Sequence, residues 1–142
     1  MIVGIAGTFA AGKGAVVDYL KTKGFVQYSI SKLLGELVEK EGNPKMRDFL
    51  GPMATKLQQE YSGGVVEKAY TEKYLFEKPE NAIFESLHRL SEAHFIKRIG
   101  GVLIGVDADL MTRYQRTQTR KEGAKDDVTL EQFKELMRVE EE

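Results

Sequence analysis

The sequence contains no cysteine and no tryptophan, and only two histidines among its 142 residues. Without cysteine it can have no disulfide framework, no thiolate nucleophile and no zinc site built on thiolates, and the two histidines have no third ligand at metal-binding spacing. No apolar run approaches the length that spans a membrane, and no basic residues precede the short apolar start as they would in a signal peptide. We therefore expect a soluble, cytoplasmic protein without a membrane partner.

An excess of one charge is also missing, because 21 basic side chains and 22 acidic ones leave a formal net charge of −1 at pH 7. A nearly neutral chain does not favour wholesale binding of nucleic acid. Positive charge does gather late in the sequence, at Arg113, Arg116, Arg120, Lys121 and Lys125. Nucleic-acid binding through this cluster remains an alternative, but the partner we expect is a small molecule.

The most informative motif lies near the start of the chain. Four residues separate Gly7 from Gly12, Lys13 follows directly, and the apolar run 2–6 precedes them. This is the spacing of a P-loop, in which glycines let successive backbone N–H groups turn toward an anion while the lysine reaches the terminal phosphates. The motif predicts a site for the phosphates of a nucleotide.

The setting of the motif strengthens this prediction. Run 2–6 is typical of a buried strand, and apolar residues lie on one face of the helix predicted between Lys13 and Gly24. Phosphate would then sit at the positive end of that helix. A glycine-rich turn in some other α/β protein is the alternative. The predicted nucleotide-binding residues are Gly7, Thr8, Ala10, Ala11, Gly12, Lys13, Gly14 and Ala15.

The rest of the chain alternates between strand and helix signals. Strands are predicted at 25–28, 82–84 and 102–106, and stretches with helical periodicity separate them. Gly51-Pro52 is expected to interrupt or restart the helix that contains it. Such alternation favours a three-layer α/β fold with a parallel sheet of four or five strands, helices on both faces and ligands at the carboxyl ends of the strands.

The residue after Lys13 indicates which class of P-loop protein the sequence resembles. Most P-loop NTPases have a serine or threonine there, whose hydroxyl binds Mg²⁺, and this chain has Gly14. The run Gly12-Lys13-Gly14 resembles the loop of adenylate kinase and its nucleoside monophosphate kinase relatives, where a threonine usually follows; Ala15 stands there instead. The resemblance implies ATP and Mg²⁺ as ligands. Without a hydroxyl at position 14 or 15, phosphates and waters would supply most of the metal coordination.

A second stretch supports the resemblance. Glu85-Ser86-Leu87-His88-Arg89 follows the strand predicted at 82–84, where these kinases carry Asp-Gly-Phe-Pro-Arg. The resemblance implies that Glu85 lies near metal-bound waters and that Arg89 contacts phosphate. Related archaeal or bacterial kinase-like ATPases place the arginine one residue earlier, which makes His88 the alternative. Glu85 could instead cap the helix that follows.

A third stretch is similar to dephospho-CoA kinase. A strand-end Asp-Ala, here Asp107-Ala108, precedes two arginines at the spacing of Arg116 and Arg120. Guanidinium groups one helical turn apart can grip the oxygens of a transferring phosphoryl group, and 112–127 is predicted to form a lid. Exposed arginines on a solvated helix are the simpler alternative, and a structural role is the simpler one for Asp107.

The sequence differs from these kinases in two respects, which limit the site residues and the fold that the resemblance implies. Gly35 stands where adenylate kinase has the arginine that binds AMP. Arg47 could contact a substrate phosphate instead, and the alternative is that it lies on a solvated helix face. Those kinases also add a fifth strand after the lid. We interpret 1–142 as a single P-loop kinase-like domain, and a missing C-terminal strand is one interpretation of this second difference.

The predicted function is ATP-dependent phosphoryl transfer to a nucleoside or deoxynucleoside monophosphate, or to dephospho-CoA. Its catalytic residues would be Lys13, Arg89, Arg116 and Arg120, with Glu85 holding Mg²⁺ through water. The alternative is a nucleotide-binding module or NTPase with little kinase activity, because of the departures at Gly14, Ala15 and Gly35. The oligomeric state stays open.

Overall fold

A computed structural model describes residues 1–120 and 128–141, apart from the side chains of 120 and 139–141. Its strands form one parallel sheet in the order β2-β3-β1-β4. They are β1 (Ile2–Gly7), β2 (Val26–Ser29), β3 (Ala82–Leu87) and β4 (Val102–Val106). The predicted α/β class and parallel sheet are confirmed, with the strand count at the lower of the two expected values.

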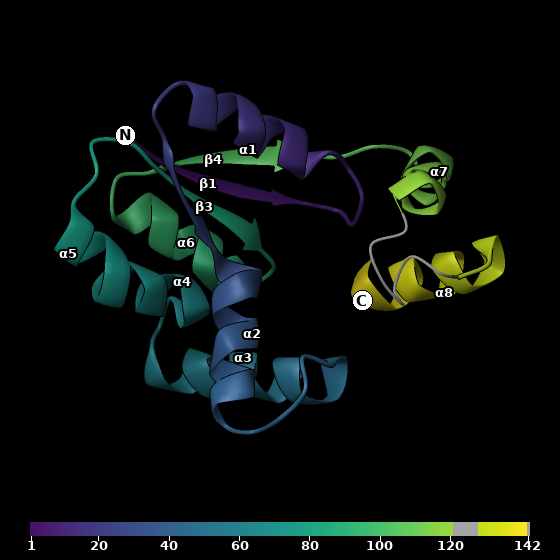
Figure 1. The fold of residues 1–142 in the computed structure, drawn as a ribbon, viewed down its shortest axis with the longest axis horizontal. Coiled ribbons are helices and arrows are strands. Elements are labelled where there is room, and N and C mark those ends of the chain that lie inside the picture. Colours follow the sequence, from purple (N-terminus) through teal and green to yellow (C-terminus); the bar gives the residue numbers. More distant parts are fainter. Residues whose placement is uncertain (121–127, 142) are drawn as a thin grey trace.

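Helices connect the strands, as parallel pairing requires. Along the described chain the helices are α1 (Lys13–Thr22), α2 (Ile30–Lys40), α3 (Arg47–Glu60), α4 (Gly64–Ala69), α5 (Leu75–Glu77), α6 (Leu90–Arg98), and, after the last strand, α7 (Leu110–Arg120) and α8 (Leu130–Glu141), with a π-helical turn η1 (Tyr70–Tyr74) between α4 and α5. Helix α1 covers one face of the sheet, α2 to α6 lie toward the other, and α7 and α8 lie beyond the carboxyl ends of the strands (Figure 1). Within the described ranges, no helix combines the length and apolar character needed to cross a bilayer.

An apolar core lies on each face of the sheet. Toward α1, Val17 packs against Val3, Ile5 and Ile83. The larger core on the other face joins Tyr28 and Phe84 to buried residues of α2, α3, α4 and α6. Burial of each large apolar side chain contributes about 1.5–3 kcal/mol, so these two cores hold the sheet between its helices and fix the edge where its strands end.

Helix α3 corrects one expectation from the sequence, since it runs through Gly51-Pro52 without a break. A proline inside a helix costs about 3 kcal/mol or more. Both residues are exposed, whereas Met53 and Leu57 are buried on the same helix. Two buried apolar side chains contribute about 1.5–3 kcal/mol each, which is enough to offset the helical bond that Pro52 cannot make.

Strand β3 is longer than predicted and contains an irregularity. Ile5 pairs with Glu85 and Ala6 pairs with Leu87, so Ser86 is an extra residue that bulges out of the ladder. Bulges of this kind re-aim side chains next to functional sites. No sequence pattern indicated the bulge, because the predicted strand stopped at residue 84.

Side-chain hydrogen bonds cap the starts of α2 and α8. The hydroxyl of Ser29 accepts the N–H of Lys32 at the start of α2, at 3.3 Å. Before α8, the N–H of Thr129 donates to the Gln132 side chain (2.9 Å) while the Thr129 hydroxyl accepts the N–H of Gln132 (3.2 Å). This reciprocal pair of hydrogen bonds is a capping box.

Glu92 is a buried carboxyl group at the start of α6. Only 3% of the residue is exposed, and its Oε1 accepts the backbone N–H groups of His88 (3.0 Å) and Arg89 (2.8 Å). Burial raises the pKa of Glu92, and these two hydrogen bonds offset part of that rise. Glu92 therefore holds the turn that carries β3 into α6.

We predict that Glu92→Ala lowers the free energy of unfolding by about 1–3 kcal/mol, because two N–H donors lose their acceptor in a buried turn. Glu92→Gln keeps an acceptor oxygen and should cost less. Because the folded-state pKa of Glu92 is raised, wild-type stability should fall relative to Glu92→Gln as pH rises through that pKa. Urea unfolding of both proteins from about pH 4 to about pH 8 measures this difference. A difference that shifts in favour of the wild type as pH rises contradicts the prediction.

Candidate functional site

The P-loop lies between β1 and α1, where the strand reaches the carboxyl edge of the sheet. Ala10 (φ 63°) and Gly12 (φ 108°) both adopt left-handed backbone conformations. The turn is closed by hydrogen bonds from Ala11 N to Thr8 O (3.1 Å) and from Ala15 N to Gly12 O (3.2 Å). A left-handed alanine costs roughly 1–2 kcal/mol and persists only where its surroundings enforce it. The loop therefore has an enforced bend, as its glycine spacing predicted.

The end of β4 holds the first half of this loop. Gly7 pairs with Val106 so closely that a Cβ on Gly7 would lie 2.1 Å from the Val106 carbonyl oxygen. Next to it, the Thr8 hydroxyl donates to Asp107 Oδ1 at 2.7 Å. Asp107 Oδ1 also accepts the N–H of Ala108 at 2.9 Å, and these bonds lower the pKa of Asp107. Asp107 therefore joins β4 to the loop as a carboxylate.

Lys13 is the first residue of α1 and folds its side chain over the loop. Its ammonium group donates to the carbonyl oxygens of Gly7 (2.8 Å) and Thr8 (3.1 Å). The amide groups of the first turn of α1 lie beside it, at the helix end where the dipole favours negative charge. A cationic side chain and a positive helix end thus meet in one loop, which is the electrostatic requirement for binding a polyphosphate.

Helices α7 and α8 approach the loop from beyond the sheet (Figure 1). Arg116 of α7 donates from Nη1 to the Ala10 carbonyl oxygen at 3.1 Å. Phe133 of α8 is fully buried, with its ring 6.2 Å from that of Phe9 and 5.5 Å from that of Tyr114. The loop is therefore attached to both helices, through one guanidinium group and one aromatic cluster.

The arginines of α7 have different positions. Arg116 lies at the loop, whereas the Arg120 side chain lies outside the described residues. Arg113, which sequence reasoning treated only as part of a basic cluster, is 5% exposed and donates from Nε to the Ala108 carbonyl oxygen at 3.0 Å. Of the predicted lid 112–127, residues 112–120 belong to α7 and 121–127 lie outside the described part of the chain.

A cavity of about 1440 Å³ opens over the loop. Four regions line it besides the loop: the start of α2, the end of β3 with the turn after it, the start of α3 with the turn before it, and α7. The lining residues are Phe9, Ala10, Ala11, Gly12, Lys13, Gly14, Ala15, Ser31, Lys45, Met46, Arg47, Asp48, Leu50, Glu85, Ser86, His88, Thr112, Gln115, Arg116 and Thr119. Single small-ligand sites usually occupy about 300–1,000 Å³, so this cavity is larger than one such site requires.

The candidate site residues at the end of β3 and in the turn after it do not all face the cavity. Glu85 and His88 line the cavity, but Arg89 does not. The Arg89 guanidinium instead donates to the Thr55 hydroxyl of α3 at 3.1 Å. The reason is local, because Arg89 occupies the N-cap of α6 while its backbone N–H is held by Glu92. Of the two alternatives at this point of the sequence, His88 is the one that faces the cavity.

Carboxylates near the cavity are too sparse to hold a metal alone. Within the described residues, no three His, Cys, Asp or Glu side chains come together as a metal site. Mg²⁺ commonly binds through one or two protein groups together with phosphates and retained waters. Glu85, beside the hydroxyl of Ser86 in the same cavity as Lys13, fits that second kind of site.

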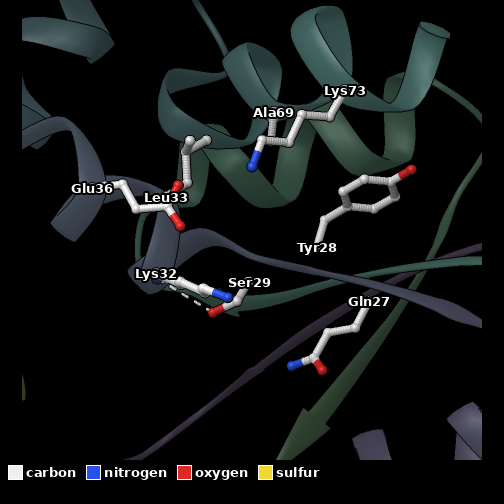
Figure 2. Close-up of a pocket in the computed structure, with 8 residues that line it drawn as sticks. All are labelled: Gln27, Tyr28, Ser29, Lys32, Leu33, Glu36, Ala69 and Lys73. Carbon is white, nitrogen blue, oxygen red and sulfur yellow. Dashed lines mark hydrogen bonds between the residues drawn. The ribbon is translucent and has the colours of Figure 1, made fainter. Parts of the chain in front are cut away.

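A second cavity, of about 330 Å³, lies between β2, α2 and η1. Figure 2 shows the side chains of Lys32, Glu36 and Lys73 around it, with the ring of Tyr28 at one side. The Tyr28 hydroxyl points away to donate to Glu77 at 2.6 Å, and burial with this neighbour raises its pKa. No P-loop residue lines this cavity, so we place the candidate site at the larger one.

Comparison with known proteins identifies the family. No family model matches the sequence. A UPF0200 protein of Sulfurisphaera tokodaii is 32% identical over 127 residues, which are 89% of this chain and 68% of that protein. The chain belongs to the UPF0200 family. That name states no activity, so the function of this UPF0200 chain has to be argued from its own site.

A solved structure supports the fold of this UPF0200 chain. The crystal structure of TT1252 from Thermus thermophilus matches with a TM-score of 0.57 at 18% identity, over 99% of this chain and 82% of that one. At this identity the likeness shows the fold alone. It supports the four-stranded parallel α/β fold of the UPF0200 chain, and that fold is consistent with a P-loop NTPase-like one.

We predict that Gly7→Ala lowers stability and distorts the loop, because its Cβ would collide with the backbone of Val106 and not with a side chain that can move. Gly14→Ala is the matched control, since a Cβ there meets nothing within 4 Å and alanine raises helix propensity by up to about 1 kcal/mol. Urea unfolding compares the two. Equal stabilities of the two variants would contradict the close approach at Gly7.

Proposed function

We propose that the chain binds ATP with Mg²⁺ and transfers the terminal phosphoryl group to a small acceptor, namely a nucleoside or deoxynucleoside monophosphate or dephospho-CoA. The observation that carries this proposal is the two-part cavity. One part is the P-loop, and the other presents Lys45 and Arg47 at the start of α3. Glu85 and Ser86 line the same cavity. Lys45 also pairs with Glu39 at 3.5 Å and Asp48 lines the same part, so an acceptor anion would contact Lys45 and Arg47 in competition with these carboxylates.

Catalysis would consist of positioning and charge neutralisation. The loop amides and Lys13 would hold the donor phosphates, and Arg116 would leave the Ala10 carbonyl oxygen for the transferring phosphoryl oxygens. We propose the same contact for Arg120, and for Arg89 once its guanidinium releases Thr55. Mg²⁺, when bound, supplies neutralisation of phosphate charge, and Glu85 would hold its waters.

The proposed reaction needs no covalent enzyme intermediate. An acceptor oxygen would bond to the γ-phosphorus as the bond from that phosphorus to the β,γ-bridging oxygen breaks, and ADP would leave. A phosphate acceptor attacks through an oxygen that is already ionised, whereas a hydroxyl acceptor must also lose a proton. Helices α7 and α8, attached to the loop, would keep water from competing as the acceptor.

A nucleotide-binding module with little transfer activity is the second candidate. The absence of a hydroxyl at Gly14 and Ala15 favours it, because a weakly held metal slows phosphoryl transfer more than it weakens nucleotide binding. Both candidates require nucleotide at Lys13, and only the kinase requires that an acceptor accelerate the conversion of ATP to ADP.

The test is ADP production with Mg²⁺ and ATP, alone and with each of several monophosphates or dephospho-CoA. We expect at least one acceptor to accelerate turnover, and Lys13→Ala to abolish that turnover and to weaken ATP binding at least tenfold. Lys21→Ala, at the far end of α1, is the control and should change neither. If no acceptor accelerates turnover but Lys13→Ala still weakens binding, the binding module replaces the kinase.

A further inference from the structure

Ser86 has a backbone conformation that serine rarely adopts. Its φ is 70°, in the left-handed region, and it is the extra residue of the bulge between β3 and β1. Such a conformation costs about 1–3 kcal/mol and is characteristic of functional sites. Here the bulge places both Glu85 and Ser86 in the lining of the cavity that contains the P-loop. In a regular strand, two successive side chains would point to opposite faces of the sheet.

The hydroxyl of Ser86 donates its proton to Glu85 Oε2. The lone pairs of the Ser86 oxygen then remain available to a cation, and the carboxylate makes that oxygen a better ligand. Glu85 retains a second oxygen for metal-bound water. A hydroxyl paired with a carboxylate is a donor set suited to Mg²⁺, which prefers oxygen ligands and retains waters.

The P-loop itself lacks this hydroxyl. In most P-loops a serine or threonine after the lysine binds the metal, whereas this chain has Gly14 followed by Ala15. Across the cavity, Ser86 is a hydroxyl residue beside a carboxylate. The bulge thus supplies a ligand type that the loop has lost.

We propose that Ser86, paired with Glu85, ligates the divalent cation of the bound nucleotide in place of the missing P-loop hydroxyl. The proposal rests on the proposed function for the presence of nucleotide. The backbone strain at Ser86 is then the consequence of turning two consecutive polar side chains toward one metal.

The test measures how much a divalent cation improves ADP binding, which does not depend on turnover. Calorimetric titration with ADP, with and without Mg²⁺, gives the ratio of the two affinities. A parallel titration of Mn²⁺·ADP, followed through the spin-resonance signal of free Mn²⁺, reports metal binding directly. We expect Ser86→Ala to reduce the metal-dependent gain by about 10- to 100-fold, the range seen when groups supporting a metal are removed. The affinity for metal-free ADP should stay unchanged.

Ser86→Gly is the control that separates loss of the hydroxyl from a change in the shape of the bulge. Glycine adopts the left-handed conformation without strain, so this variant should fold at least as well as the wild type while still lacking the hydroxyl. If Ser86 matters only for the shape of the bulge, Ser86→Gly keeps the metal-dependent gain, and the proposal is overturned. It is also overturned if either variant weakens metal-free ADP binding as much as it weakens metal-dependent binding.

A rescue experiment tests the replacement itself. Gly14→Ser restores a hydroxyl to the loop, and a Cβ at residue 14 meets nothing within 4 Å. Combined with Ser86→Ala, it should recover much of the lost gain, and failure to recover any contradicts the stand-in role. If the wild type binds no ADP even without metal, the proposed function fails; if it binds ADP and Ser86→Ala leaves the gain intact, only this inference fails.

Discussion

The close contact between β1 and β4 at Gly7 and Val106 is the constraint on which the site depends. It leaves no space for a side chain at residue 7, and the bond from Thr8 to Asp107 continues it. The chain must then turn back through the left-handed Ala10 before α1 can begin. The sheet therefore fixes the position of the loop, and the loop fixes where Lys13 and the first amides of α1 lie.

The remaining parts of the site are arranged around that loop. Arg116 and Phe133 bring α7 and α8 against it, and the bulge at Ser86 brings the end of β3 to the same cavity. Ala10 and Ser86 adopt left-handed backbone conformations although neither is glycine, and both line the cavity. Such strain persists only where the surroundings enforce it; here the hydrogen bonds that close the loop surround Ala10, and the pairing of β3 with β1 surrounds Ser86.

Much of the fold follows from patterns that act locally. The strands at the sheet centre, the loop and the capping box of α8 were predictable because apolar spacing and cap residues determine them over a few positions. The continuity of α3 through Pro52 was not, because burial of Met53 and Leu57 against distant helices decides it. The bulge at Ser86 and the turning of Arg89 toward Thr55 also depend on strand register and helix packing, which single-sequence spacing does not contain.

The central claim is that the backbone between residues 7 and 14 surrounds the phosphates of a nucleotide. It is tested most directly by following the backbone amide resonances of ¹⁵N-labelled protein as ADP and Mg²⁺ are added. The account predicts that the largest shifts fall on the loop amides from Thr8 to Gly14, with smaller ones near Glu85 and Arg116. If the loop resonances do not shift and the largest shifts fall near Tyr28, Lys32 and Lys73, the ligand binds in the other cavity and the account is contradicted.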